Sequence, residues 1–107
     1  MSLVVVMTTS ENVNQLEKMA QAAVDRGLAA CVQIVGPITS VYRWQGKTES
    51  AQEFRCEMKT TLDNLKRLES LIRELHSYEL PEIIAFPVTY ASEDYGRWVR
   101  DHTAQEE

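Results

Sequence analysis

Two long segments of the chain, residues 29–44 and 47–60, are rich in residues that favour β-strands and are separated only by Gln45 and Gly46. A two-residue connection in which glycine can adopt a positive φ is typical of a tight β-hairpin turn. Strands of this length would each extend roughly 45 Å at the usual rise per residue. The fold therefore has to accommodate one unusually long hairpin.

The pairing register of this hairpin cannot be continuous from the turn. Counting outward from the turn places Ile34 opposite Glu57, which mixes apolar and polar residues on one face of the ribbon. A shift of one residue places Ile34 opposite Cys56 instead and restores an apolar face. Because Gly36 and Pro37 lie where the shift is needed, and a bulge tolerates both residue types, we predict a bulge or kink there.

The flanking segments supply two helices and two further strands. The continuous apolar run 3–7 is typical of a central strand. Apolar residues recur at helical spacing over 11–26 and again over 61–76, which predicts two amphipathic helices. Residues 82–86 form a short apolar run, and residues from 92 onward predict a short helix carrying Tyr95, Trp98 and Val99.

Several residues mark where these elements begin and end. Ser10 or Asn12 can cap the first helix and Gly27 can end it, while Thr61 can cap the second helix, which should end near His76. Pro87 lacks a backbone donor and should confine the last strand to a sheet edge or a bend.

The element order βαββαβ followed by a helix predicts an α+β, ferredoxin-like sandwich with strand order 4-1-3-2 and both main helices on one face. At 107 residues and 44% hydrophobic, residues 1–107 can form one domain with its own core. The strand over 3–7 covers only about 20 Å, so the far half of the hairpin overhangs.

The overhang carries Ile38, Val41, Tyr42 and Trp44, side chains that would stay exposed unless another chain covers them. We therefore expect self-association. The alternative is a curled ribbon that packs on its own subunit.

Charge and cysteine content restrict the partners and the compartment. The net charge is −5, and the 11 Lys and Arg are scattered along the chain, so we expect no nucleic-acid partner. No apolar run is long enough for a membrane span. Cys31 and Cys56 have no nearby second ligand of the kind found in structural zinc sites, so we interpret them as buried free thiols. Free thiols suit a reducing compartment, and we expect a cytoplasmic protein.

Four segments carry a resemblance to a known family. They are AACVQI at 29–34, GPITSVYRWQGK at 36–47, MKT at 58–60 and HSYELPEI at 76–83. This succession resembles the CutA divalent-ion tolerance family over nearly the whole chain. The resemblance implies a ferredoxin-like subunit, a homotrimer in which long hairpins embrace neighbouring subunits, and a link to tolerance of copper and other divalent cations.

The resemblance also bears on copper binding, which it implies for some bacterial members of the family. Those members carry a cysteine near the end of the first strand and two consecutive histidines at the start of the fourth segment. The corresponding residues here are Met7 and the pair Leu75 and His76, so only His76 carries over.

His76 and Glu79 are the candidate metal ligands, because an imidazole beside a carboxylate can hold a divalent cation such as Cu²⁺. The alternative is that His76 interacts favourably with the dipole at the end of its helix. No cofactor is required by either interpretation.

Further candidates for a cleft or an interface are polar-tipped and charged residues within the family-like segments: Tyr42, Trp44, Lys59, Tyr78 and Glu82. Tyrosine and tryptophan combine apolar area with a polar group, so they suit subunit packing as well as a pocket wall. As a pocket wall, they would line an intersubunit cleft that takes a small anionic or metal-bound ligand, with Lys59 as its charge partner.

Catalysis has little support in the residue pattern. The serines and cysteines lack an evident His and acid in a recognisable motif, and no glycine-rich phosphate loop is present. The leading hypothesis is a homotrimeric divalent-cation (copper) tolerance protein that binds or senses metal weakly and is not an enzyme. The competing hypothesis is a signalling or scaffold trimer, similar to PII proteins, that binds a small molecule or a protein at its clefts.

Overall fold

The computed structural model describes residues 2–104, which form a four-stranded antiparallel sheet with helices packed against it. The strands are β1 (Leu3–Ser10), β2 (Cys31–Trp44), β3 (Lys47–Thr61) and β4 (Ile84–Pro87). Their order across the sheet is β2-β3-β1-β4, with every neighbouring pair antiparallel. The predicted strand order is therefore confirmed, and β4 lies at an edge, as Pro87 indicated.

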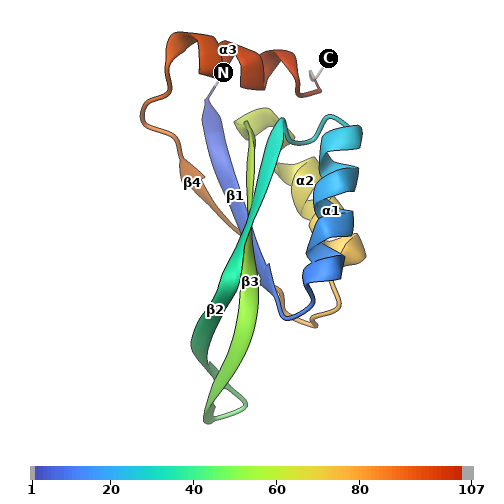
Figure 1. Cartoon of the computed structure of the whole chain (residues 1–107), viewed down its shortest axis with the longest axis vertical. Helices are drawn as coiled ribbons and strands as arrows, with labels where there is room; N and C mark the ends of the chain where they lie inside the picture. Colours follow the sequence, from blue (N-terminus) through green and yellow to red (C-terminus); the bar gives the residue numbers. More distant parts are fainter. Residues whose placement is uncertain (1, 105–107) are drawn as a thin grey trace.

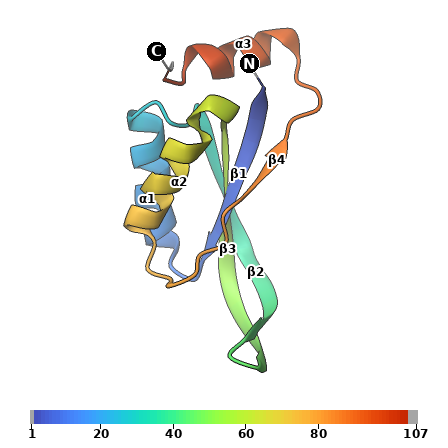
Figure 2. The same ribbon diagram turned by 180° about the vertical axis from the view of Figure 1, so that it is seen from behind.

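The helices are α1 (Val13–Asp25), α2 (Leu65–Leu75) and α3 (Glu93–Asp101), with a 3-10 turn, η1 (Leu62–Asn64), before α2. Both α1 and α2 cover the same face of the sheet, while α3 crosses one end (Figures 1 and 2). The backbone N–H of Ala104 donates to the carbonyl of Gly27 at 2.6 Å, which ties the end of α3 to the end of α1. This is the α+β ferredoxin-like architecture that the sequence predicted.

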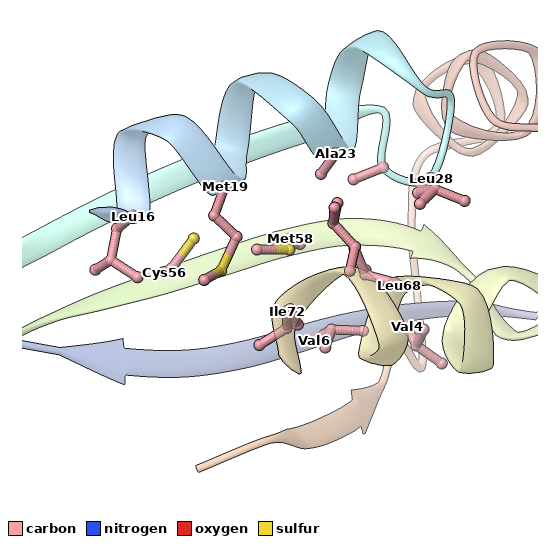
Figure 3. Packing of buried hydrophobic residues seen from close by; sticks show 12 residues of the cluster. Val4, Val6, Leu16, Met19, Ala23, Leu28, Cys56, Met58, Leu68 and Ile72 are labelled. Carbon is pink, nitrogen blue, oxygen red and sulfur yellow. The ribbon is translucent and has the colours of Figure 1, made fainter. Parts of the chain in front are cut away.

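The core lies between this face of the sheet and the two helices (Figure 3). Val6 of β1 and Met58 of β3 are directly paired and completely buried. Leu16 and Met19 of α1 and Ile72 of α2 close over them, also without exposed area. Apolar residues at alternate strand positions meet apolar helix stripes, which is the pattern that burial of one sheet face requires.

The hairpin follows the shifted register that the sequence predicted. Ile34 pairs with Cys56, and the irregularity falls between Val35 and Ile38. Gln45 and Gly46 form the turn with φ values of 50° and 79°. Beyond the irregularity the ribbon continues past the helix layer and projects from the body of the molecule (Figure 1), so its far half has no covering element within residues 2–104.

Two expectations about individual residues were wrong. Thr61 makes no side-chain cap, because η1 begins directly after it and α2 starts only at Leu65. Cys31 is half-buried rather than buried, since it lies on the sheet face opposite the helices, whereas Cys56 is completely buried among them. The predicted cap Asn12 is confirmed, since its side chain accepts from the backbone N–H of Gln15, and the structure adds Ser92 as the cap of α3.

Apart from α3 at one end, where Tyr95 lies beside Cys31, the second face of the sheet carries no helix within residues 2–104. Its apolar residues include Val35, Ile84 and Phe86, which are 37%, 44% and 49% exposed. Phe86 pairs with Val5 and Ile84 pairs with Met7, so β1 and β4 together present a continuous apolar strip on this uncovered face. Among residues 2–104, no helix is long and apolar enough to cross a membrane.

Candidate functional site

A groove of about 630 Å³ lies where the projecting hairpin leaves the body of the molecule. One wall is formed by residues 40–44 of β2 and the other by residues 78–82, the segment that leads from α2 toward β4. Thr9, Glu11 and Glu53 complete the lining. Five of the predicted site residues therefore share one groove within a single chain: Tyr42, Trp44, Tyr78, Glu79 and Glu82.

Tyr78 connects three parts of this groove. Its hydroxyl donates to Oε2 of Glu53 at 2.7 Å and accepts from the backbone N–H of Glu11 at 2.9 Å. Burial, followed by the hydrogen bond to Glu53, raises the pKa of Tyr78 well above its ordinary value. The phenol therefore stays protonated at neutral pH and remains a hydrogen-bond donor to the carboxylate.

Glu53 is unusual for a carboxylate because only 7% of the residue is exposed. None of the basic side chains in residues 2–104 comes within 4.0 Å of it in an ion pair. Its Oε2 is held by Tyr78, and its Oε1 has no hydrogen-bond partner in the same part of the chain. A buried charge is costly unless it is paired, so this carboxylate is predisposed to meet a cation.

The groove as a whole is acidic. Its lining contains four carboxylates, Glu11, Glu53, Glu79 and Glu82, and one guanidinium, that of Arg43. The guanidinium donates from Nη2 to the carbonyl of Gly46 at 3.2 Å and so interacts with the hairpin turn. Since low-dielectric walls strengthen the field of such a cluster, the groove favours positively charged ligands over anions.

His76 lies at the end of α2, and both of its ring nitrogens are used inside the chain. Nδ1 accepts from the backbone N–H of Tyr78 at 3.1 Å, so Nε2 carries the proton of the neutral ring and donates to the carbonyl of Thr9 at 2.7 Å. His76 also packs on the ring of Tyr78, with 4.6 Å between the ring centroids. The imidazole thus orients the segment that lines the groove, although His76 itself is not among the lining residues.

Lys59 lies away from the groove, on the uncovered face of the sheet. It pairs with Cys31 across the hairpin, and its Nζ donates to Oε1 of Gln33. The amide of Gln33 in turn donates to Sγ of Cys31 at 2.9 Å. Within one chain the structure therefore does not bring Lys59 together with the other candidate residues.

The side chains that could ligate a metal ion do not converge on one point in the described part of the chain. Within residues 2–104 there is no group of three or more His, Cys, Asp or Glu side chains that could hold a metal ion. Burial raises the pKa of the Cys56 thiol to about 12, and neighbouring Glu57 adds to the effect, so this thiol remains protonated. A single chain offers His76 and the groove carboxylates as separate potential donors only.

Sequence reasoning missed Glu11, Arg43 and above all Glu53. Glu53 alternates with apolar residues along its strand, a pattern that normally indicates a solvated side chain. The available signal was the register counted outward from the turn, which places Glu53 opposite Ile38 just before the shift begins. Its burial depends on Tyr78, which lies 25 residues further along the chain.

The fold and the groove define a small α+β protein of ferredoxin-like topology with an extended hairpin. The sequence matches the family described as CutA1 divalent ion tolerance protein over residues 4–102. This match covers nearly the whole chain, and the chain belongs to that family.

Individual relatives agree with this assignment. The divalent-cation tolerance protein CutA of Thermus thermophilus is 38% identical over 99 residues, covering 92% of this chain and 96% of the relative. Protein CutA of Homo sapiens is 38% identical over 95 residues, and the match spans 89% of this chain but 53% of the human protein. The crystal structure of CutA1 from Oryza sativa superposes with a TM-score of 0.94 at 32% identity, covering 98% of this chain and 96% of that one.

Proposed function

We propose that this protein is a cytoplasmic homotrimer that contributes to tolerance of divalent cations, copper among them, by binding the cation weakly and without catalysing a reaction. The observation that carries the proposal is the acidic groove, in which the buried carboxylate of Glu53 has no cationic partner within residues 2–104. Membership of a family described by divalent ion tolerance supports the same conclusion.

Self-association is supported by two surfaces that a single subunit leaves open. The apolar strip of β1 and β4 includes Ile84 and Phe86, and the far half of the hairpin exposes Val41 at 67%. Exposed strand edges and apolar faces of this kind are normally covered by another chain. Light scattering should therefore give three times the 12.2 kDa subunit mass both with and without a chelator. A monomeric mass would contradict the proposal.

We expect metal binding at His76 to be weak, because both ring nitrogens already take part in hydrogen bonds within the chain. A metal ion needs a ring lone pair, so either the bond from Tyr78 N–H to Nδ1 or the bond from Nε2 to Thr9 has to be given up. The free energy lost with that bond is subtracted from the binding energy. Glu79 is three residues away and lines the groove, and it supplies the second proposed ligand.

A paired histidine experiment tests metal binding. His76→Gln keeps an N–H donor for Thr9 but removes the imidazole, while His102→Gln changes an exposed histidine whose Nδ1 contacts the carbonyl of Trp98. With Cu²⁺ at a hundred times its dissociation constant, we expect the parent and the His102 variant to gain about 2.7 kcal/mol of stability. The His76 variant should gain much less in the same thermal-shift measurement. Equal gains in all three proteins would exclude His76 as a ligand.

The cytoplasmic location rests on the free thiols. Cys31 and Cys56 are both unpaired. Because Cys56 pairs with Ile34, three positions along the strand from Cys31, the two thiols face opposite sides of the sheet and cannot be joined within one subunit. Free thiols are typical of a reducing compartment.

The second candidate is a trimer that signals or acts as a scaffold by binding a small molecule or a protein at its clefts. The aromatic wall of the groove favours it, since Tyr42 and Trp44 are 42% and 40% exposed. Two results of the thermal-shift measurement would shift support to this candidate. Cu²⁺ could stabilise the parent and both histidine variants equally, or it could stabilise none of the three proteins.

A further inference from the structure

The asparagine at the start of α2 does not make the local contact that its residue type and position favour. Asn64 occupies the N-cap position of α2, where asparagine is preferred because its side-chain oxygen can accept from a backbone N–H of the first turn. Here the side chain makes no such bond, although the residue is completely buried. A favourable local interaction that is left unused indicates that the side chain serves a contact elsewhere in the fold.

That contact is with the residues that follow α3. Nδ2 of Asn64 donates to the carbonyl of Ala104 at 3.1 Å and to Oγ1 of Thr61 at 2.8 Å. Oδ1 accepts from Nη2 of Arg67 at 2.6 Å, which fixes the orientation of the amide. Asn64 and Ala104 are 40 residues apart, so the bond joins two distant parts of the chain.

Ala104 is held from both sides. Its carbonyl accepts from Asn64, and its backbone N–H donates to the carbonyl of Gly27 at 2.6 Å. A Cβ at Gly27 would lie 3.3 Å from the nitrogen of Ala104, so glycine permits this close approach. These bonds lie within one chain, at the end of the molecule opposite the hairpin turn, so they do not depend on which surfaces a neighbouring chain covers (Figures 1 and 2).

Within one chain, α3 has few other means of staying in place. Residues 88–92, which connect β4 to α3, belong to no helix or strand. The buried residues of α3 are Gly96 and Val99, so one buried side chain anchors the helix. A helix of 9 residues is too short to be stable without tertiary contacts. The position of α3 across the end of the sheet therefore depends on the bonds made by Ala104 (Figure 1).

From these features we infer that residues 93–104 form a C-terminal strap that docks across the end of the sheet and opens locally as a unit, and that Asn64 is its latch. Regions with few buried apolar contacts open at lower free energy than the core does. In the closed position the strap places Tyr95 beside Cys31 at the start of β2. Opening would uncover this end of the sheet without unfolding α1 or β1. The inference does not rest on the proposed function.

Hydrogen exchange of the full chain, measured by mass spectrometry, tests the latch. Asn64→Asp keeps an acceptor for Arg67 and can cap α2, but it lacks the N–H groups that donate to Ala104. Backbone amides of residues 98–104 should exchange about tenfold faster than in the parent, while those of α1 and β1 should keep the parent rates. Asn64→Ser avoids a buried charge and has a side chain too short to reach Ala104, so it should give the same local pattern.

The matched control is Asn12→Asp, because the side chain of Asn12 accepts from the backbone N–H of Gln15 and aspartate retains that role. Its α3 should exchange as in the parent. Three outcomes would overturn the inference. In the first, α3 exchanges at the parent rate in both Asn64 variants, as expected if another contact or a neighbouring copy of the chain holds it. In the second, amides of α1, β1 and α3 accelerate by the same factor, which would indicate that α3 opens only when the whole chain unfolds. In the third, Asn12→Asp accelerates α3 as much as Asn64→Asp does.

Discussion

Two buried threonine hydroxyls on neighbouring strands differ in their hydrogen bonding. Thr8 of β1 and Thr60 of β3 are both completely buried. Thr60 Oγ1 donates to the carbonyl of Leu28 at 2.7 Å, whereas Thr8 Oγ1 has no partner in the described residues. A buried hydroxyl without a partner loses its hydrogen bonds to water and gains nothing in return.

This difference predicts opposite effects of one substitution. Thr8→Val removes an unsatisfied hydroxyl with little change of shape, so the free energy of unfolding should stay the same or rise by about 1 kcal/mol. Thr60→Val removes a satisfied donor and should lower it by about 1 kcal/mol. Urea denaturation of both variants and the parent at one protein concentration checks the prediction. A loss of stability in Thr8→Val as large as that in Thr60→Val would show that Thr8 has a partner after all.

Individual residues also show how far the sequence could predict the site. Tyr42, Trp44 and Tyr78 were identified from their amphipathic chemistry and their segments, and the structure places all three in the groove. Glu53 could not be identified in this way, because its burial results from contact with Tyr78, a residue distant in sequence. Lys59 was grouped with the aromatic residues although it pairs with Cys31, six residues along β3 from Glu53 and therefore far from the groove along the strand.

At the scale of elements, the hairpin was the most predictable part of the fold. Its turn and its shifted register depend on local residue types and on keeping apolar residues on one face, and both were confirmed. The start of α2 was less predictable. Thr61 is a common capping residue, but the chain inserts η1 before the helix, and Thr61 Oγ1 instead accepts from the side chain of Asn64 at 2.8 Å.

The irregularity in β2 gives an element-scale prediction about Gly36. A Cβ at this position, where φ is +155°, would lie 2.7 Å from Cδ2 of Phe54 and 3.1 Å from the carbonyl oxygen of Glu53. Gly36→Ala should therefore cost about 2–3 kcal/mol of stability through overpacking against the partner strand. It should also weaken any ligand binding that depends on Glu53. Thermal and urea denaturation measure the first effect, and calorimetry measures the second.

Gly46 provides the control, because its φ is +79° but a Cβ there would meet nothing within 4 Å. Gly46→Ala should cost only about 1 kcal/mol, the penalty for a side chain in a left-handed conformation. Similar losses in the two variants would mean that Phe54 and the partner strand move aside at Gly36 without significant cost.

At the scale of the whole molecule, the sheet has one face buried under α1 and α2 and one face without a cover in the described residues (Figures 1 and 2). The sequence predicted an overhanging hairpin but not the apolar strip of β1 and β4. The strip arises because β4 pairs with β1 and aligns Phe86 with Val5. That pairing depends on where the segment after α2 crosses the sheet, which no local pattern specifies.

The uncovered face gives the last prediction, which concerns assembly. Phe86 is 49% exposed in the middle of the strip, so Phe86→Lys would place a charge where the proposed trimer buries apolar area. Light scattering should show the mass falling from three times 12.2 kDa toward the mass of one subunit. Val24→Lys is the matched control, because Val24 is 43% exposed on α1 and lies outside that face of the sheet. The prediction would be contradicted if the Phe86 variant kept the mass of three subunits, or if the Val24 variant dissociated to the same extent. Either result would show that the subunits meet through a different surface. The hairpin would then be the first place to look for that surface, because its far half is the other region that a single subunit leaves without cover.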